Sequence, residues 1–166
     1  MSSVQAPQPP LVPYRTTLHV RDHCLCLHIQ RAARALARHF DIVLKPLGLT
    51  NGQFSLLMSL NRPGPAGMAG VASLLAMDRT TLTAALKPLQ RRGLLRVAAD
   101  PEDRRARLLT LTPRGAALLA RAVPLWENTH AEVEATLPDR GADTLRHSLQ
   151  ILHTTLNPSR TSRTAP

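Results

Sequence analysis

The chain has 166 residues, 43% of them hydrophobic, which is enough apolar material for one core but too little length for two. Its 21 Lys and Arg residues outnumber 11 Asp and Glu residues, and the resulting net charge of +10 calls for an anionic partner. An aromatic content of 2% argues against single-stranded nucleic acid bound by base stacking, and no long apolar span or aromatic-studded amphipathic face points to a membrane. The remaining candidate for the anionic partner is double-stranded DNA, bound through its phosphates.

The first 20 residues form a proline-rich segment without the apolar stretch of a secretory signal. We therefore expect a flexible arm and a cytoplasmic protein. Cys24 and Cys26 are too few and too close together to be a disulfide framework, so they are candidates for thiol chemistry or for core positions.

Apolar residues recur at alternating steps of three and four from Leu25 to Leu47, with arginines between them. This spacing predicts one long amphipathic helix over residues 21–48. We expect it to stop near Lys45, because Pro46 disfavours a helical residue before it and Gly48 follows.

The stretch from Leu49 to Gly115 has the pattern of a winged helix-turn-helix. A helix begins after Thr50 or Asn51, residues 61–67 (NRPGPAG) form a turn, and residues 68–76 form a short apolar helix.

The next helix has Asp78 as its N-cap and Gly93 at its C-terminal end. Pro88 lies inside it and removes a backbone hydrogen bond, so we expect a bend or a local loosening after Ala84.

Two strand-like runs, residues 94–98 and 107–111, flank a charged tip and predict a β-hairpin wing. Thr112 and Pro113 then provide a cap and a first-turn proline for another long helix, which Pro124 can bend. Leucines at Leu145, Leu149, Leu152 and Leu156 predict a last helix that ends before Pro158.

The sequence contains, in this order, MDRTTLT, LQRRGLL and DPEDRRARLLTLTPRG. This ordered set resembles the MarR family of bacterial regulators, named for multiple antibiotic resistance, in which a capped recognition helix, a charged helix end with glycine and a wing with an Asp-x-Arg tip follow one another. The resemblance extends over roughly residues 25–156.

The resemblance implies a mainly α fold with a small β-hairpin wing and an obligate homodimer held by the first and last helices on a pseudo-palindromic operator. The implied domains are an arm (1–20), a first dimerisation helix (21–48), the DNA-binding lobe (49–113), C-terminal dimerisation helices (114–157) and a disordered tail (158–166). The surplus of apolar positions on the first and last helices independently favours an interface.

In this interpretation, five residues lie on or near the exposed face of the recognition helix: Arg79, Thr80, Thr81, Thr83 and Lys87. Arg79, near the helix N-terminus, is the candidate for a bidentate contact to guanine, whereas the threonines suit phosphates or thymine methyl groups. Simple capping and surface solvation is the alternative for each threonine.

At the wing, Arg105 matches the arginine that family members insert into the minor groove, and Asp103 matches the acid that orients it. A narrow minor groove concentrates negative potential and favours a guanidinium. Arg104 and Arg107 are then phosphate contacts, and a solvated hairpin tip is the alternative.

Cys26 falls where the organic-hydroperoxide-responsive branch of the family keeps its reactive cysteine, but the tyrosines that hold that thiolate are missing from the second helix. Cys24 and Cys26 lie on different sides of the predicted helix, which disfavours a bond between them and leaves an intersubunit disulfide open. A buried, inert thiol is the alternative, and the spacing of His23 with Cys26 gives only a weak zinc hypothesis. We assign no metal and no cofactor.

Many MarR-like proteins bind aromatic acids in a cleft between the dimer helices and the DNA-binding lobe. The residues that we expect to line such a site are Tyr14, Arg15, His19 and His23. Arg15 or a protonated histidine would pair with a carboxylate, and ordinary surface positions on a loose arm are the alternative.

The sequence thus predicts a dimeric, sequence-specific transcriptional regulator, most simply a repressor released from DNA by an aromatic acid-like effector. A thiol-based redox repressor acting through Cys26, Cys24 or both is one alternative. A sequence-tolerant architectural DNA-binding protein is another, although it would not need the Arg-Thr-Thr recognition face. An enzyme is not expected, because no nucleophile, base and orienting acid form a recognisable set.

Overall fold

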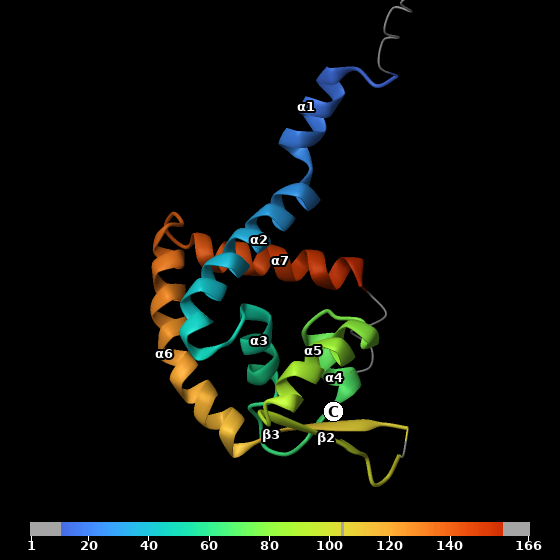
Figure 1. Cartoon of the computed structure of the whole chain (residues 1–166). Helices are drawn as coiled ribbons and strands as arrows, with labels where there is room; N and C mark the ends of the chain where they lie inside the picture. The colour runs from blue at the N-terminus through green and yellow to red at the C-terminus, as the bar shows by residue number, and fades with distance from the viewer. Residues whose placement is uncertain (1–10, 104, 158–166) are drawn as a thin grey trace, which may run out of the picture. The chain divides into compact units, whose positions relative to one another are not determined.

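The computed structural model describes residues 11–103 and 105–157, and Figure 1 shows their course. The chain divides into two compact units, residues 1–38 and 39–166, and the boundary falls inside helix α2 (Leu25–Leu44). None of the helices in the described ranges is both long and apolar enough to cross a membrane.

The first unit contains helix α1 (Tyr14–His23) and the N-terminal part of α2, separated at Cys24. Helical structure therefore reaches into the segment expected to be a flexible arm, and the helix predicted over residues 21–48 is interrupted. Cys24 has an extended ψ of 104°, and its Sγ accepts the backbone N–H of Leu27 at 3.5 Å. The thiol thus takes the place that a Ser or Asp side chain takes at an ordinary N-cap.

The second unit begins with the rest of α2 and a 3-10 turn, η1 (Lys45–Leu47), which ends at Gly48 with a φ of +65°. The predicted stop near Lys45 is confirmed. Helix α3 (Asn51–Ser59) follows with a capping box, in which Thr50 Oγ1 accepts the Gln53 N–H and Gln53 Oε1 accepts the Thr50 N–H, both at 3.2 Å.

Helices α4 (Met68–Leu74) and α5 (Arg79–Arg91) form the helix-turn-helix with α3. Gly93, with a φ of +67°, ends α5, and the Leu94 N–H returns to the Leu89 carbonyl at 3.0 Å. Helix α5 runs from Arg79 to Arg91 without a break at Pro88. The carbonyl that Pro88 leaves without a helical partner belongs to Ala84, an exposed residue, so water can satisfy it.

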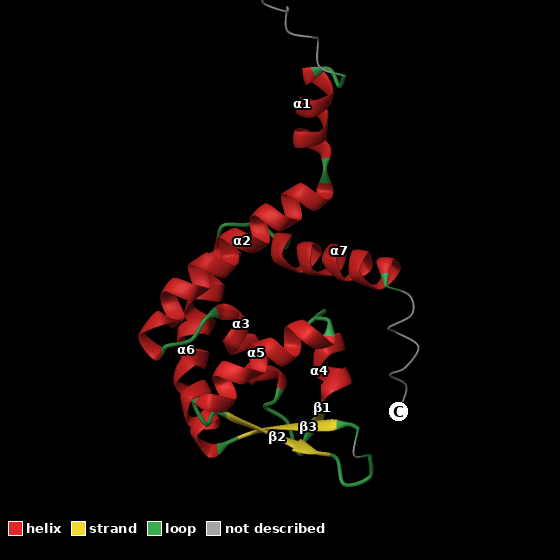
Figure 2. Ribbon diagram, turned by 45° about the vertical axis from the view of Figure 1, so that its right-hand side comes forward, coloured by secondary structure: helices red, strands yellow, loops and turns green. Residues whose placement is uncertain are grey.

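A three-stranded antiparallel sheet in the order β1-β3-β2 forms the wing (Figure 2). Strands β2 (Leu95–Ala99) and β3 (Arg107–Leu111) pair in register from Leu95 opposite Leu111 to Ala99 opposite Arg107. The two-residue strand β1 (Ala66–Gly67) adds to β3. The sequence predicted only a turn there, because two residues are too few to show the alternation typical of a strand.

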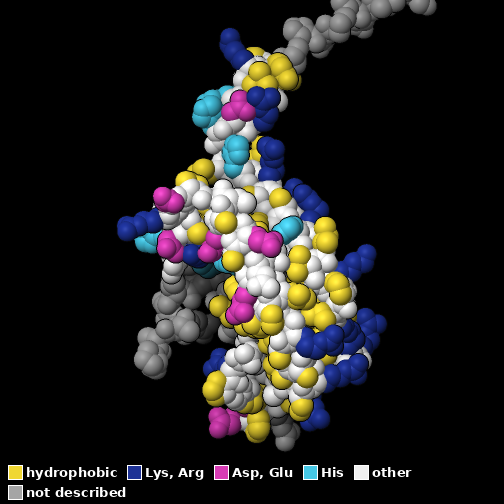
Figure 3. All heavy atoms as spheres, turned by 90° about the vertical axis from the view of Figure 1, so that its left-hand side faces the viewer, with side chains coloured by type: hydrophobic (Ala, Val, Ile, Leu, Met, Phe, Trp, Pro, Cys, Tyr) yellow, Lys and Arg dark blue, Asp and Glu magenta, His cyan; other side chains and the backbone are white. Residues whose placement is uncertain are grey.

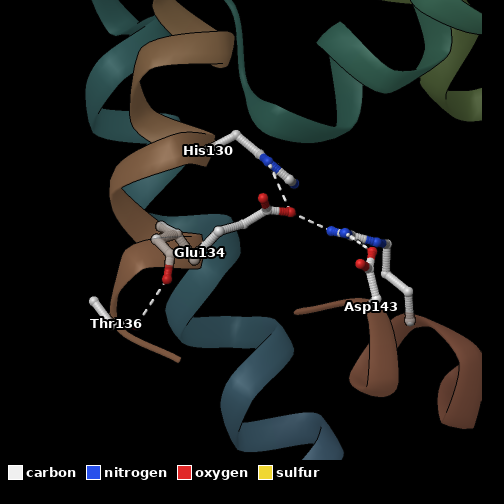
Figure 4. Close-up of polar contacts among 6 residues, drawn as sticks. His130, Glu134, Thr136 and Asp143 are labelled. Atoms are coloured by element: carbon white, nitrogen blue, oxygen red, sulfur yellow. Dashed lines mark hydrogen bonds and ion pairs between the residues drawn. The ribbon is translucent and has the colours of Figure 1, made fainter. Parts of the chain in front are cut away.

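Helix α6 (Pro113–Ala135) is capped by Thr112, whose Oγ1 accepts the Gly115 N–H at 3.0 Å, and it continues through Pro124. Helix α7 (Gly141–Leu156) is joined to it by side chains (Figure 4). Arg146 of α7 donates to Glu134 of α6 and, at 2.5 Å, to Asp143, while His130 Nδ1 lies 3.4 Å from Glu134 Oε1.

The core of the second unit is built almost entirely from leucine. The eight largest side chains that are fully buried are Leu44, Leu56, Leu57, Leu82, Leu89, Leu94, Leu95 and Leu109. They come from α2, α3, α5, β3 and the start of β2, so that a single core fixes the recognition helix against both the wing and the preceding helices.

The base of the wing meets the start of α6 at an unusually close approach. A Cβ atom built on Gly115 would lie 2.0 Å from the Leu94 carbonyl oxygen and 2.9 Å from Leu111 Cδ1. The same Leu94 carbonyl accepts the Thr112 N–H at 3.1 Å, and Thr112 Oγ1 donates to the Gly93 carbonyl at 2.7 Å. Only glycine allows the helix backbone to approach the strand this closely.

We therefore expect Gly115→Ala to lower the free energy of unfolding by about 1–3 kcal/mol, because backbone on both sides must shift to make room for a methyl group. Urea unfolding followed by circular dichroism measures the change. The control is Gly70→Ala in α4, where a Cβ would meet nothing within 4 Å, so stability should be unchanged or slightly higher. Equal stability of the two variants would contradict the proposed packing constraint.

Candidate nucleic-acid interface

The N-terminus of α5 is fixed by Asp78, as the sequence predicts. Asp78 Oδ1 accepts the Thr81 backbone N–H at 2.8 Å, and Oδ2 accepts the Thr81 hydroxyl at 2.6 Å. The hydroxyl of Thr81, followed by its backbone N–H, lowers the pKa of the Asp78 carboxyl. Thr81 is therefore engaged in capping, which is the structural alternative that the sequence left open for it.

The other four predicted residues of the recognition helix share one exposed face. Leu82, Leu86 and Leu89 are buried, and the opposite side of α5 carries Arg79, Thr80, Thr83 and Lys87, all exposed. The Thr83 hydroxyl donates to the Arg79 carbonyl at 2.7 Å, which leaves its oxygen able to accept. A guanidinium, two hydroxyls and an ammonium thus follow one helical stripe.

The sequence analysis did not assign Gln90 and Arg91 to this face, although helical periodicity places them there. Both are exposed and line, with Lys87, a shallow hollow at the C-terminal end of α5. Arg92, the next residue, is different, because its guanidinium donates to the Gly48 carbonyl at 2.6 Å and so ties the end of α5 to η1.

The tip of the wing is held by two short carboxylate turns. Asp100 Oδ1 accepts the Glu102 N–H at 3.0 Å, and Asp103 Oδ1 accepts the Arg105 N–H at 2.9 Å. Asp103 therefore orients Arg105 through its backbone, and the Arg105 side chain extends into solvent.

Further cations belong to the strands of the wing. Arg107 is exposed at the start of β3 and donates to the Ala106 carbonyl at 3.2 Å, whereas Arg104 lies outside the described residues. Arg96, which the sequence analysis missed, is exposed on β2 opposite Thr110, and the alternation of buried Leu95 and exposed Arg96 was the available signal. Figure 3 shows one face of the molecule, on which several Lys and Arg side chains of the second unit lie close together at the surface.

The residues expected to bind an effector, Tyr14, Arg15, His19 and His23, all lie on α1 and are exposed. The rings of His19 and His23 stack at 4.3 Å, and His23 Nδ1 lies 2.9 Å from the His19 carbonyl oxygen.

The two cysteines are free thiols at the junction of α1 and α2. Cys24 is half-buried, whereas Cys26 is exposed and accepts from Gln30 Nε2 at 3.1 Å. Because Cys24 lies between the helices, the expectation that both thiols occupy one continuous helix was wrong. In residues 11–103 and 105–157, no three His, Cys, Asp or Glu side chains are grouped so that they could hold a metal ion.

A cleft lies between α3, α4 and α6, and we call it the α3–α6 cleft. Its volume is about 450 Å³, and its walls are Phe54, Ser55, Met58, Ser59, Leu74, Val123, Trp126 and Glu127. The Phe54 and Trp126 rings are stacked, with centroids 6.1 Å apart. The sequence analysis named none of these residues as a site, because they come from three separate helices.

The sequence model of the MarR family matches residues 49–106, which contain α3, α4, α5 and the wing tip. The DNA complex of the transcriptional regulator MosR from M. tuberculosis is 37% identical in sequence, with a TM-score of 0.75, over 83% of this chain and 99% of that one. The chain belongs to the MarR family. Membership of a family of transcriptional regulators agrees with the expectation that the chain is not an enzyme.

Two further proteins are similar to this chain. The repressor NicR of Pseudomonas putida is 37% identical over 76 residues, which are 46% of this chain and about half, 48%, of NicR. The structure of Bordetella bronchiseptica BpsR, described in connection with regulation of its DNA binding by 6-hydroxynicotinic acid, is 28% identical with a TM-score of 0.71. It covers 79% of this chain and 94% of that one.

The lowered pKa of Asp78 predicts an acid-sensitive recognition helix. Because this carboxyl titrates below its ordinary value of 3.8 in the folded state, the ionised cap stabilises the protein above that value and is lost as the pH falls through the lower, folded-state pKa. Asp78→Asn keeps an oxygen that accepts the Thr81 N–H but does not titrate.

We expect the variant to lose less stability than the wild type when urea unfolding near neutral pH is compared with unfolding at about pH 3. An identical acid response of the two proteins would show that the Asp78 cap does not contribute to the pH dependence.

Proposed function

We propose that this MarR-family protein is a homodimeric, sequence-specific DNA-binding repressor that a small-molecule effector releases from a pseudo-palindromic operator. The observation that carries the proposal is the exposed stripe of Arg79, Thr80, Thr83 and Lys87 on a helix whose opposite side is fixed in the core. The DNA complex of MosR, at 37% identity, supports DNA as the partner.

In this proposal α5 enters the major groove with its N-terminal end leading, so that Arg79 reads guanine. Thr80, Thr83 and Lys87 contact phosphates or thymine methyl groups. The wing places Arg105 in the adjacent minor groove, where Asp103 fixes the backbone from which that side chain extends. Arg107, Arg96 and Arg104 add positive charge around the wing.

Exposed apolar side chains support the homodimer and the proposed division into a DNA-binding lobe, residues 49–113, and dimerisation helices. Helices α2 and α7 are both amphipathic, yet each leaves large apolar side chains exposed. These are Leu25 and Leu36 on α2, and Leu145, Leu149 and Ile151 on α7. A second copy of the chain would cover such faces and place two recognition helices about 34 Å apart on DNA.

The α3–α6 cleft is the place that we propose for the effector. It has the size of a small-molecule site, and one of its walls comes from α4, the helix that packs against α5. BpsR is regulated by 6-hydroxynicotinic acid, a single-ring molecule, which supports a small-molecule effector of about that size for this chain. The sequence predicts an effector carboxylate paired with Arg15 or a histidine of α1; these residues belong to the first unit, whereas the described lining of the α3–α6 cleft belongs to the second.

Two arginine variants test the DNA-binding mode on a fragment from beside the protein's own gene. Arg105→Ala should weaken binding to all sequences by about tenfold, because a minor-groove guanidinium is lost. Arg79→Ala should instead reduce discrimination between the operator and single-base variants by about tenfold at one position. Fluorescence anisotropy at fixed salt measures both.

Arg121→Ala on α6 removes one positive charge at an exposed site outside α5 and the wing, and it should change neither property strongly. If the wild type bound random DNA as tightly as the operator fragment at physiological salt, the repressor proposal would give way to an architectural role.

Thiol-based redox control through Cys24, Cys26 or both is a second candidate, favoured by the break between α1 and α2. The Cys24 Sγ atom caps α2 by accepting the Leu27 N–H, so oxidation of that sulfur would change the cap as well as the thiol. Cys26 is exposed and accessible to an oxidant or to a second subunit.

Gel shifts of the wild type, Cys24→Ser and Cys26→Ser with and without peroxide separate redox control from effector control. Cys24→Ser keeps a capping oxygen and should fold normally, yet it should lose most peroxide sensitivity if Cys24 is the sensor. Retained sensitivity in the double variant would remove this candidate.

A further inference from the structure

We infer that the α3–α6 cleft selects an aromatic cation, a planar ring that carries an amine, rather than an aromatic acid. Only the effect of this ligand on DNA binding rests on the proposed effector function. The choice of ligand charge follows from the residues that line the cleft.

The walls of the cleft suit a flat apolar group. Phe54 is 5% exposed and lies under the half-buried ring of Trp126, with an interplanar angle of 21°. Val123, Met58 and Leu74 complete an apolar surround, and the last two are exposed at the opening. A single aromatic ring with a short side chain fits a volume of about 450 Å³.

The polar groups of the cleft are the Ser55 and Ser59 hydroxyls, the Trp126 indole N–H and the carboxylate of Glu127, which is exposed. Among the described residues that line it, Glu127 alone is charged, and within the described part of the chain its carboxylate has no hydrogen-bond or ion-pair partner. The Ser59 hydroxyl proton is donated to the Leu56 carbonyl at 2.7 Å, which leaves its oxygen to accept. A ligand that carries positive charge matches the one charged group among these described residues.

Electrostatics disfavour an acid in the same place. Among the described residues that line the cleft there is no Lys or Arg, and Glu127 would repel a carboxylate. The ring of His130 lies 4.6 Å from the Trp126 ring, but its Nδ1 is 3.4 Å from Glu134 Oε1, and Glu134 also binds Arg146. A cation, in contrast, is attracted by Glu127.

The sole tryptophan of the chain is Trp126, so its fluorescence reports directly on the cleft. Three probes share a phenyl ring and a short chain but differ in charge at neutral pH: 2-phenylethylammonium, 2-phenylethanol and phenylacetate. We expect the ammonium probe to bind tighter than phenylacetate by about tenfold, with the alcohol between them.

Glu127→Gln should remove most of that preference while leaving the affinity for 2-phenylethanol unchanged. Glu132→Gln, an exposed carboxylate on the same helix but outside the cleft, should keep the preference. Phenylacetate binding as tightly as the ammonium probe, or a preference that survives Glu127→Gln, would overturn the inference, and so would a fluorescence signal that responds to none of the probes.

Operator binding is measured separately, by anisotropy of a labelled fragment with saturating 2-phenylethylammonium. Release of DNA by this probe supports both the cation site and its regulatory role. Charge-selective binding without any change in operator affinity would support the cation site and contradict the proposed effector function.

Discussion

The close approach of Gly115 to the Leu94 carbonyl is the constraint on which the arrangement of this lobe depends. Around it, Thr112 donates its backbone N–H to the Leu94 carbonyl and its hydroxyl to the Gly93 carbonyl, so the end of α5, both long strands and the start of α6 meet within a few residues. Because leucines from each of these elements are buried together, a shift at this junction cannot be absorbed locally. The exposed stripe of α5 and the arginines of the wing are consequently held by one rigid piece of structure.

Local chemistry explains which features the sequence could predict. The caps at Thr50, Asp78 and Thr112 were predictable, because an N-cap depends on side chains within three residues of the helix start. The break at Cys24 was not, because cysteine is not among the usual N-cap residues and only the geometry shows its thiol acting as the cap. The third strand was missed for a related reason, since Ala66 and Gly67 form a strand only through pairing with a distant partner.

The candidate sites divide in the same way. Residues of the recognition face follow from periodicity along one helix, and the structure separates Thr81 from that face only because its hydroxyl caps through Asp78. The wing tip follows from a contiguous motif. The α3–α6 cleft has no contiguous signal: Phe54 and Trp126 are 72 positions apart, and nothing in their spacing indicates that their rings stack. The charged and histidine side chains of α1, in contrast, are contiguous in sequence, which is why the effector site was predicted there.

Helix α6 links the proposed effector site to both functional ends of the lobe. Trp126 and Glu127 form one wall of the cleft, the N-terminus of the same helix is fixed to the wing through Thr112 and Gly115, and its C-terminal turn is bound to α7 through Glu134. Suppose that α6 can adopt two positions relative to α3. A ligand that binds one of them more tightly would shift the equilibrium between the two positions by the difference in its affinities. Because the close contact at Gly115 prevents the wing from sliding over α6, a displacement of α6 would move the wing and the DNA-binding face with it.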